Sequence, residues 1–376
     1  MTDAVRLHST ERRGYMKIAV YAIAKNEEKF VERWYNSMKE ADEIFVCDTG
    51  SKDNTAEKLE RLGAKVKRIN IEPWRFDRAR NESLEFVDED VDICVCTDLD
   101  EVFSKGWRRE LEKHWNSEAT RASYNYIWDF DEKGKARTTF NIEKIHLRHG
   151  FKWVHPVHEV LQYNGEKRDS TVIIDSITLR HYPDKKKSRA QYLPLLELSV
   201  KEDPEDDRNM HYLGREYMYK NEYGKAIKTL KQHLKLERAV WKDERCASMR
   251  YIARCYQNQG NNLQAYKWYL RSIAEAPYLR EPYIETALFA SEIKNYELCI
   301  FCVNEALKIK SKPKSYINEY YCWNSTPYDL LSVAYYNTEQ YILAKKYAYL
   351  AYSIDKENER IINNIKLINK KIQKPE

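Results

Sequence analysis

The spacing of apolar residues changes once along the chain, and this change constrains the fold more than any other feature. From Lys17 to Asp100, short apolar runs that suit buried strands alternate with segments whose apolar residues recur at helical spacing. From Arg189 onward only the helical spacing remains. The first pattern predicts βαβ units with a mostly parallel sheet, and the second predicts helices alone. We therefore predict an α/β domain followed by an all-α domain.

The length of the chain supports this division. A chain of 376 residues is long for one domain. We predict a flexible tail over 1–16, an α/β domain over 17–188 and a helical domain over 189–376, with the basic run at 185–187 near the boundary. The first 14 residues are polar and basic without an apolar stretch, so we expect neither a secretory signal nor a membrane anchor there.

Composition limits the class of protein. The net charge of +5 is spread through both halves, which argues against a nucleic-acid partner because such proteins concentrate basic residues on one face. No apolar run approaches the roughly 20 residues of a membrane span, so we expect a soluble protein. The 8 cysteines are scattered, as expected for reduced thiols in the cytoplasm. The pair Cys299 and Cys302 has no second pair nearby, and we expect a structural role for it.

Polar turns follow three of the predicted strands. Carboxyl ends of parallel strands meet at one edge of a sheet, where ligands bind. The predicted strands and their turns are Lys17–Ala24 with Lys25–Glu27, Glu43–Cys47 with Asp48–Thr55, and Val91–Thr97 with Asp98–Glu101. The sequence has neither a G-x-G-x-x-G motif nor a Walker lysine loop, which argues against a dinucleotide enzyme and a P-loop NTPase.

The third turn carries three carboxylates, Asp98, Asp100 and Glu101. Carboxylate oxygens at a sheet edge suit Mg²⁺ or Mn²⁺, and such a cation pairs with a negatively charged group such as a diphosphate. An isolated Asp-x-Asp is more often a solvated acidic turn, so this interpretation depends on the neighbouring turns.

Histidines are concentrated between His146 and His181, after two predicted strands over Arg121–Phe130 and Lys135–Ile142. A hydrogen-bonded structural role is the default for each histidine. The pair His158-Glu159 and the later His181 are the exceptions, which we treat as candidates for catalysis or metal binding.

The helical half contains a weak internal repeat. A small residue recurs in similar surroundings at Ala226, Ala265, Cys299 and Ala344, at intervals of 39, 34 and 45 residues. Each lies between an upstream and a downstream helical pattern. This resembles tetratricopeptide repeats, which have a period of about 34 residues. A non-repeating helical bundle is the alternative.

Taken in order, five motifs of the first half resemble glycosyltransferase family 2, whose members are inverting enzymes with the GT-A fold. The last motif is similar to the branch that includes lipopolysaccharide-core glucosyltransferases and bacteriocin S-glycosyltransferases. The resemblance covers about Lys17–Pro183. The motifs are AIAKNEE (Ala22–Glu28), VCDTGSKDNT (Val46–Thr55), WRFDRARN (Trp74–Asn81), TDLDE (Thr97–Glu101) and KWVHPVHEVL (Lys152–Leu161).

The resemblance implies roles for individual residues. The residues implied to contact the base and ribose are Ala24, Asn26, Glu27, Asp48 and Ser51, with Asp53 supporting the turn. Arg80 and Asn81 would lie near the sugar donor, helped by Asp77 or Arg78. Asp98 would bind the ribose or a metal-bound water, and Asp100 would bind the metal directly.

Two assignments stay open at this point. An inverting transfer needs a base to take the acceptor's proton, and the candidates are Glu159 and Glu101. A histidine completes the metal shell in many GT-A enzymes, and the candidates are His158 and His181.

The resulting hypothesis is a glycosyltransferase that depends on Mn²⁺ or Mg²⁺ and moves a hexose from a nucleotide sugar, with a UDP-sugar as first choice. The acceptor would be a hydroxyl or thiol of a glycan, a lipid-linked saccharide or a peptide, and the repeats would bind a protein partner, form a homodimer or shape the acceptor site. One alternative is an inactive, transferase-like scaffold. Another is a sugar nucleotidyltransferase, which needs a glycine-rich loop after the first strand that this sequence lacks.

Overall fold

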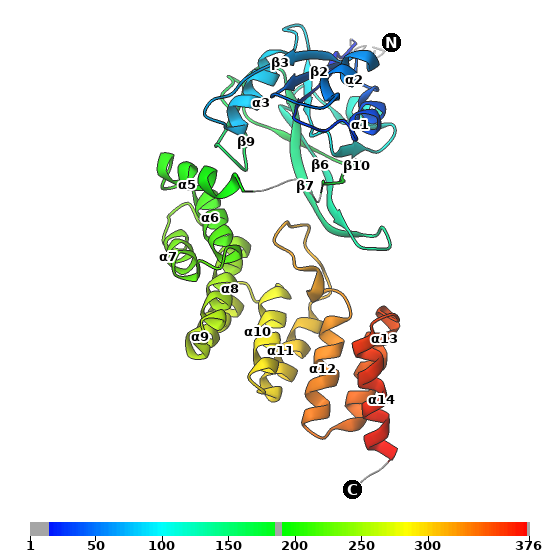
Figure 1. Ribbon diagram of the computed structural model, residues 1–376, viewed down its shortest axis with the longest axis vertical. Helices are drawn as coiled ribbons and strands as arrows, with labels where there is room; N and C mark the ends of the chain where they lie inside the picture. Colours follow the sequence, from blue (N-terminus) through cyan, green and yellow to red (C-terminus); the bar gives the residue numbers. More distant parts are fainter. Residues whose placement is uncertain (1–14, 185–189, 374–376) are drawn as a thin grey trace, which may run out of the picture. The chain divides into compact units, whose positions relative to one another are not determined.

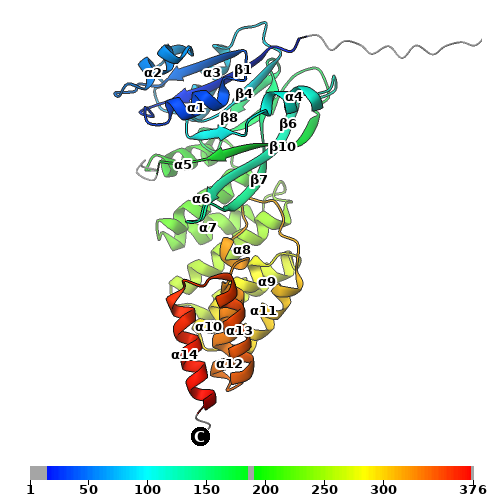
Figure 2. The same ribbon diagram turned by 90° about the vertical axis from the view of Figure 1, so that its right-hand side faces the viewer.

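The structure is a computed structural model and describes residues 15–184 and 190–373. These residues form two compact units, one of residues 15–130 with 140–184 and one of residues 131–139 with 190–373. The first unit is α/β and the second contains the helices α5 to α14, which confirms the predicted fold class (Figures 1 and 2). The predicted boundary at residue 188 and most of the predicted tail over 1–16 lie outside the described residues, so these bounds stay predictions.

The first unit is organised around an eight-stranded sheet with the order β3-β2-β1-β4-β7-β6-β10-β5. A separate hairpin is formed by β8 and β9. The strands are β1 (Ile18–Ala24), β2 (Glu43–Asp48), β3 (Lys65–Arg68), β4 (Ile93–Cys96), β5 (Glu101–Phe103), β6 (Arg121–Phe130), β7 (Ala136–Leu147), β8 (Phe151–Val154), β9 (Val160–Tyr163) and β10 (Thr171–His181).

The four strands β3, β2, β1 and β4 pair in parallel, as the alternating pattern predicts. Their apolar residues are covered by helices on both faces, which is why β1 and β4 read as continuous apolar runs. Residues of α1, α4 and the sheet share one buried cluster, which holds the strand ends in fixed positions. The helices are α1 (Val31–Met38), α2 (Thr55–Leu62), α3 (Phe76–Glu85) and α4 (Trp107–His114).

The other half of the sheet differs from the predictions. β7 continues past the predicted end at Ile142 to Leu147. β5, β8, β9 and β10 were not predicted. The sequence of β10 lacks a regular alternation of apolar and polar residues. The reason is that its pairing with β6 is interrupted between Ile174 and Thr178, which shifts the alternation of its side chains. β10 is parallel to β6 and antiparallel to β5.

The second unit is a series of antiparallel helix pairs flanked by α5 (Tyr192–Glu202) and α14 (Glu359–Gln373). The pairs are α6 (Asp207–Tyr219) with α7 (Tyr223–His233), α8 (Lys242–Asn258) with α9 (Asn262–Glu275), α10 (Glu281–Glu292) with α11 (Tyr296–Lys308), and α12 (Thr326–Asn337) with α13 (Tyr341–Ile354). Each pair contains one predicted upstream and one predicted downstream segment, so the helical repeat is confirmed.

A repeated turn explains the spacing of the small residues. Each is fully buried, and a residue with positive φ lies five positions before each of them. These turn residues are Asn221, Gly260, Lys294 and Glu339, with φ between 60° and 74°. The left-handed residue ends the first helix of each pair, and the small side chain five residues later lets the second helix pack closely.

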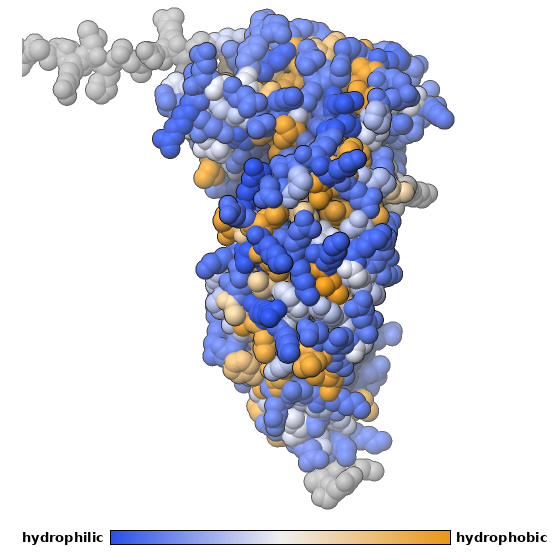
Figure 3. Space-filling model, turned by 90° about the vertical axis from the view of Figure 1, so that its left-hand side faces the viewer, coloured by the Kyte–Doolittle hydropathy of each residue, from blue (hydrophilic) through white to orange (hydrophobic). Residues whose placement is uncertain are grey.

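The face of the molecule drawn in Figure 3 is predominantly hydrophilic. On the face drawn in Figure 3, hydrophobic residues form separate patches among hydrophilic ones. Of the helices in residues 15–184 and 190–373, none is both long and apolar enough to cross a membrane. All 8 cysteines are buried and unpaired, and Cys299 and Cys302 pack in the core of the third helix pair.

Candidate functional site

The turn after β2 is built around the carboxylate of Asp48. Its Oδ1 accepts hydrogen bonds from the backbone N–H of Gly50 (3.0 Å) and of Ser51 (2.9 Å). Its Oδ2 is buried and has no hydrogen-bond partner in the described part of the chain. A buried carboxylate oxygen without a donor is costly, so Asp48 is poised to accept a hydrogen bond from a ligand.

The turns after β1 and β2 hold each other in place. Asn26 has a φ of 55°, donates from its backbone N–H to Ser51 Oγ (2.9 Å), and accepts from Lys52 N–H at its side-chain oxygen (2.7 Å). The backbone N–H of Glu27 donates to Thr55 Oγ1 at 2.8 Å. Ala24 joins the same arrangement because its carbonyl accepts from Thr49. The predicted nucleotide-binding residues are therefore brought together.

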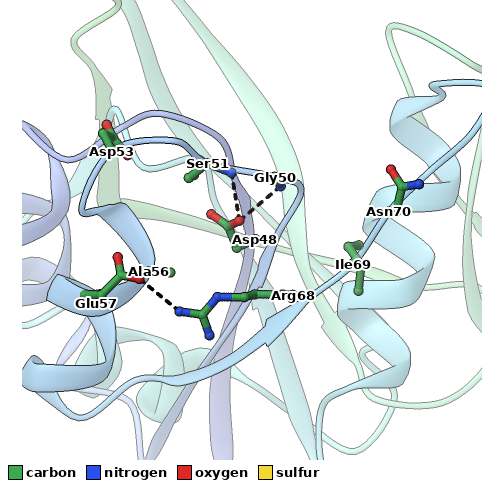
Figure 4. A pocket seen from close by; sticks show the side chains of 9 residues that line it. All are labelled: Asp48, Gly50, Ser51, Asp53, Ala56, Glu57, Arg68, Ile69 and Asn70. Atoms are coloured by element: carbon green, nitrogen blue, oxygen red, sulfur yellow. Dashed lines mark hydrogen bonds and ion pairs between the residues drawn. The ribbon is translucent and has the colours of Figure 1, made fainter.

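A pocket of ≈ 340 Å³ opens beside Asp48, within the size range of small-molecule sites. Figure 4 shows Asp48 facing the backbone of Gly50 and Ser51, with Arg68 paired to Glu57 across the pocket. The pocket is lined by Asp48, Gly50, Ser51, Asp53, Ala56, Glu57, Arg68, Ile69 and Asn70. Asp53 has the predicted supporting role, since it accepts hydrogen bonds from Glu28 N–H and Thr55.

A network of charges lies at the end of β4. Arg80 from α3 donates to Asp98 Oδ1 at 2.9 Å and also binds Glu159. Lys144 from β7 lies 3.3 Å from Asp98 Oδ2 and 3.2 Å from Glu101 Oε1. Because β1 alone separates β2 from β4, Asp98 is about 10 Å from the Asp48 turn along the sheet edge.

Opposing effects set the protonation of this network. Burial alone would raise the pKa of Asp98, but the charges of Arg80 and Lys144 outweigh it and hold the pKa below its usual value. Burial raises the pKa of Glu101, although Lys144 opposes the shift. Burial would lower the pKa of Lys144, and the two carboxylates reverse that effect. Asp98 and Lys144 are therefore both charged at neutral pH.

Asp100 faces His181. Strand β5 pairs with β10 so that Glu101 lies opposite His181, which brings His181 Nε2 within 3.3 Å of Asp100 Oδ2. The other ring nitrogen, Nδ1, lies 2.9 Å from the carbonyl of Trp128, whose indole stacks on the imidazole with centroids 4.4 Å apart. Burial lowers the pKa of His181, but Asp100 outweighs burial and the net shift is upward.

These two side chains fit a divalent cation. With Nδ1–H donating to a carbonyl, the lone pair of Nε2 points toward Asp100, the usual arrangement of a metal-binding histidine. Two ligands of one octahedral ion at about 2.1 Å lie about 3.0 Å apart, close to the observed separation of Asp100 and His181. The neighbouring carboxylates outnumber the neighbouring cations, which also favours a cation. The carboxylates are Asp98, Asp100, Glu101 and Glu159, and the cations are Arg80 and Lys144.

The two candidate bases have different surroundings. Glu101 is fully buried, and both its oxygens are used: Oε1 accepts from Tyr126 (2.7 Å) and Oε2 from Asp98 N–H (2.9 Å). Glu159 is partly exposed, and only its Oε1 is bound, by Arg80. Its Oε2 has no hydrogen bond within the residues that the structure describes. The geometry favours Glu159 for proton transfer and gives Glu101 a supporting role.

Three further predicted residues lie near the network. Asn81 bonds at both ends of its amide to the backbone of Trp153, so it anchors β8 to α3. His158 lies on the loop before Glu159 with a φ of 51°. Asp77 is paired with Arg75 at 2.8 Å. Of the two candidate histidines, His181 is the one placed beside Asp100.

Lys144, Tyr126 and Trp128 belong to the site but were not found from the sequence. Lys144 and Tyr126 lie on strands that read only as alternating surface strands. The sequence around Lys144, IEKIHL, carries no signal that an acidic partner is near. Finding these residues requires the pairing of β7 with β4 and of β6 with β10, which no local pattern specifies.

Comparison with known proteins gives a family for residues 19–182. The family model described as Glycosyl transferase family 2 matches residues 19–182, from β1 to the residue after His181. Residues 19–182 form a glycosyl transferase family 2 domain. This family 2 domain contains every candidate site residue described above.

Two curated relatives are named as glycosyltransferases. An uncharacterized glycosyltransferase of Rickettsia bellii is 37% identical over 97 residues, which is 26% of this chain and 32% of the relative. An uncharacterized glycosyltransferase of Rickettsia conorii is 39% identical over 100 residues, which is 26% of this chain and 33% of the relative. The match thus spans about a third of the length of each relative.

Solved structures resemble the chain more distantly. The crystal structure of MamA protein is 17% identical with a TM-score of 0.35 and covers 45% of this chain and 83% of that one. The crystal structure of the APC/C hetero-tetramer Cut9-Hcn1 is 15% identical with a TM-score of 0.39. The match covers 49% of this chain and 33% of that one. At such TM-scores the likeness carries no argument, and the repeats rest on the helix pairs themselves.

Proposed function

We propose that the family 2 domain transfers a hexose from a nucleoside diphosphate sugar, with a UDP-sugar as first choice, to an acceptor hydroxyl or thiol with inversion. The observation that carries the proposal is the pairing of Asp100 with His181 at the same sheet edge as the Asp48 pocket. The Asp48 pocket would take the nucleoside. The Asp98 network would take the diphosphate and sugar.

Mg²⁺ or Mn²⁺ held by Asp100 and His181 would supply positive charge against the negative charge that grows on the leaving diphosphate. Arg80 and Lys144 add positive charge beside it and fix Asp98. These groups are held by packing before the donor binds, so little reorganisation is needed in the transition state.

Glu159 is the proposed base. Its free oxygen would take the proton of the acceptor while the acceptor's oxygen or sulfur attacks the anomeric carbon, and the bond to the diphosphate breaks on the opposite face. The ion pair with Arg80 orients Glu159. A single displacement of this kind inverts the configuration of the sugar.

The second unit supports a proposal for the role of the repeats. Stacked helix pairs form extended surfaces that bind peptides or other proteins. We propose that this unit binds the acceptor or a protein partner, or forms a homodimer. The acceptor itself is a saccharide or a peptide.

The test is nucleoside diphosphate release by the full chain with Mn²⁺ and a panel of nucleotide sugars. We expect release with one donor, and a loss of about 100-fold or more in Asp100→Asn because a direct metal ligand is removed. Asp90→Asn is the matched control, since Asp90 is an exposed partner of Lys17 away from the site.

Equal activity of Asp100→Asn and Asp90→Asn would contradict the proposed metal ligand. If no donor is bound or turned over by the wild type, the enzyme proposal fails and the scaffold alternative gains support. Donor binding by calorimetry separates a missing acceptor from an absent donor site.

A further inference from the structure

A second group of metal-ligating side chains lies in the helical unit, apart from the family 2 domain. It consists of His211 on α6, His233 on α7 and Glu244 on α8. One ligand atom from each residue lies within 4.8 Å of the others. The two histidines are fully buried and Glu244 is 3% exposed. These three residues meet where the first helix pair packs against the second.

The histidines present unpaired nitrogens to the carboxylate. Nε2 of His211 and Nε2 of His233 are both buried without a hydrogen-bond partner among the described residues. Nε2 of His233 lies 3.4 Å from Glu244 Oε1. A buried polar atom without a partner costs about 1–3 kcal/mol. Two such nitrogens beside one carboxylate point to a ligand that all three atoms share.

Ser248 orients both imidazoles. Its Oγ lies 2.7 Å from His211 Nδ1 and 2.9 Å from His233 Nδ1. The hydroxyl oxygen can accept a hydrogen bond from each Nδ1–H, which leaves the lone pair of each ring on Nε2. A hydrogen bond from the distal N–H is what fixes metal-binding histidines in position.

The carboxylate is oriented in a comparable way. Tyr316 donates to Glu244 Oε2 at 2.5 Å, so the other oxygen faces the histidines. The rings of Tyr212 and Trp241 pack against Tyr316, with centroids 6.0 Å and 5.6 Å away. The three proposed ligands are themselves buried, which suits a structural ion better than a catalytic one.

The protonation states agree with metal binding at neutral pH. Burial lowers the pKa of His211 to about 3, so its ring is neutral. Burial raises the pKa of Glu244, but the neighbouring His233, His211 and Tyr316 outweigh it and lower the pKa to about 2. Metal ligands must be deprotonated, and no proton has to leave either group.

We propose that His211, His233 and Glu244 bind one divalent transition-metal ion, with Zn²⁺ as the best fit, and that this ion ties α6 and α7 to α8. Two nitrogens and one carboxylate oxygen match zinc, whereas Mg²⁺ and Ca²⁺ prefer oxygen alone. Tetrahedral ligands of zinc lie about 3.4 Å apart, so the atoms must approach by about 1.4 Å at most. A water molecule would complete the shell.

The test is zinc affinity of the EDTA-treated full chain, measured in competition with a chromogenic chelator. We expect one tightly bound Zn²⁺ in the wild type and a loss of at least about tenfold in affinity in Glu244→Gln and His211→Ala. Glu244→Gln keeps the shape of the side chain and an acceptor for Tyr316. His149→Ala is the matched control because His149 is exposed, and it should bind as the wild type does.

The Asp100→Asn variant separates this ion from the one proposed in the family 2 domain. It should keep the tight Zn²⁺, and Co²⁺ bound in its place should show the visible absorption of a four-coordinate site. Zn²⁺ should also raise the melting temperature of Asp100→Asn but not that of Asp100→Asn/Glu244→Gln.

Unchanged zinc affinity in folded Glu244→Gln and His211→Ala would overturn the proposal. If these variants do not fold, the Zn²⁺ and Co²⁺ measurements on Asp100→Asn decide whether the three residues bind a metal ion. The absence of tight Zn²⁺ and of the Co²⁺ absorption would then show that the group is a metal-free hydrogen-bonded network.

Discussion

At the scale of single residues, Arg80 connects two carboxylates of the candidate site. It is 5% exposed and binds both Asp98 and Glu159. Burial would lower the pKa of Arg80, but the two carboxylates reverse that effect and keep it charged. Asp98, which is proposed to bind the sugar donor, and Glu159, the proposed base, therefore share one buried cation. The position of each carboxylate depends on the other.

Arg80→Met should destabilise the family 2 domain by about 2–3 kcal/mol, because two partly buried carboxylates lose their buried partner. The measurement is the free energy of unfolding in urea. Arg68→Met is the control, since Arg68 is exposed and its ion pairs should contribute under about 1 kcal/mol. A change below about 1 kcal/mol for Arg80→Met would contradict the role of Arg80.

At the scale of elements, charged side chains join consecutive helix pairs. Glu285 on α10 is 2% exposed and binds Arg250 and Arg254, both on α8. Arg254 donates to both oxygens of Glu285, at 2.8 Å and 2.7 Å, and also to Tyr321 at 2.6 Å. The second and third helix pairs are thus fastened by a bidentate ion pair in addition to apolar packing.

This ion pair predicts acid sensitivity. Burial raises the pKa of Glu285, but the two arginines outweigh it and the net shift is downward. A carboxylate with a lowered pKa stabilises the fold above its unfolded value of about 4.3, and that stability is lost as the pH falls further. Glu285→Gln should cost about 3–5 kcal/mol at pH 7, and the difference from wild type should shrink below pH 4.

Urea unfolding at several pH values measures this difference. Glu297→Gln is the control, since Glu297 is exposed on α11 and should behave as the wild type at every pH. A difference between wild type and Glu285→Gln that stays constant down to pH 3 would show that the charge of Glu285 is not responsible.

At the scale of the whole molecule, each unit contains hydrophobic clusters of its own. Among the described residues, two buried clusters contain residues of the first unit alone, and the clusters around α10 to α14 contain residues of the helical unit alone. Each unit therefore has the means to fold by itself, and the site residues all lie in one of them.

Deletion of residues 189–376 should leave a soluble family 2 domain that unfolds cooperatively and hydrolyses the donor within about twofold of the full chain, because no site residue is removed. Transfer to the natural acceptor should be lost if the repeats bind that acceptor. Circular dichroism during heating and nucleoside diphosphate release measure the first two properties. An insoluble fragment would contradict independent folding, and full transfer by a soluble fragment would exclude acceptor binding by the repeats.

The sequence by itself determined the order of elements and the class of each unit. The continuous apolar runs of β1, β2 and β4 and the polar turns after them are local patterns, so the Asp48 turn and the Asp98–Glu101 turn could be assigned to one sheet edge. The repeat was readable for the same reason, because each small residue and its turn lie within a few positions of each other.

Only the tertiary structure decided which residues meet. His181 reaches Asp100 because β10 pairs with β5, and Lys144 reaches Asp98 because β7 pairs with β4. The group of His211, His233 and Glu244 depends in the same way on the packing of three helices. Hydrophobic periodicity specifies which face of an element is buried. It leaves open which distant element covers that face, because many pairings bury similar apolar area.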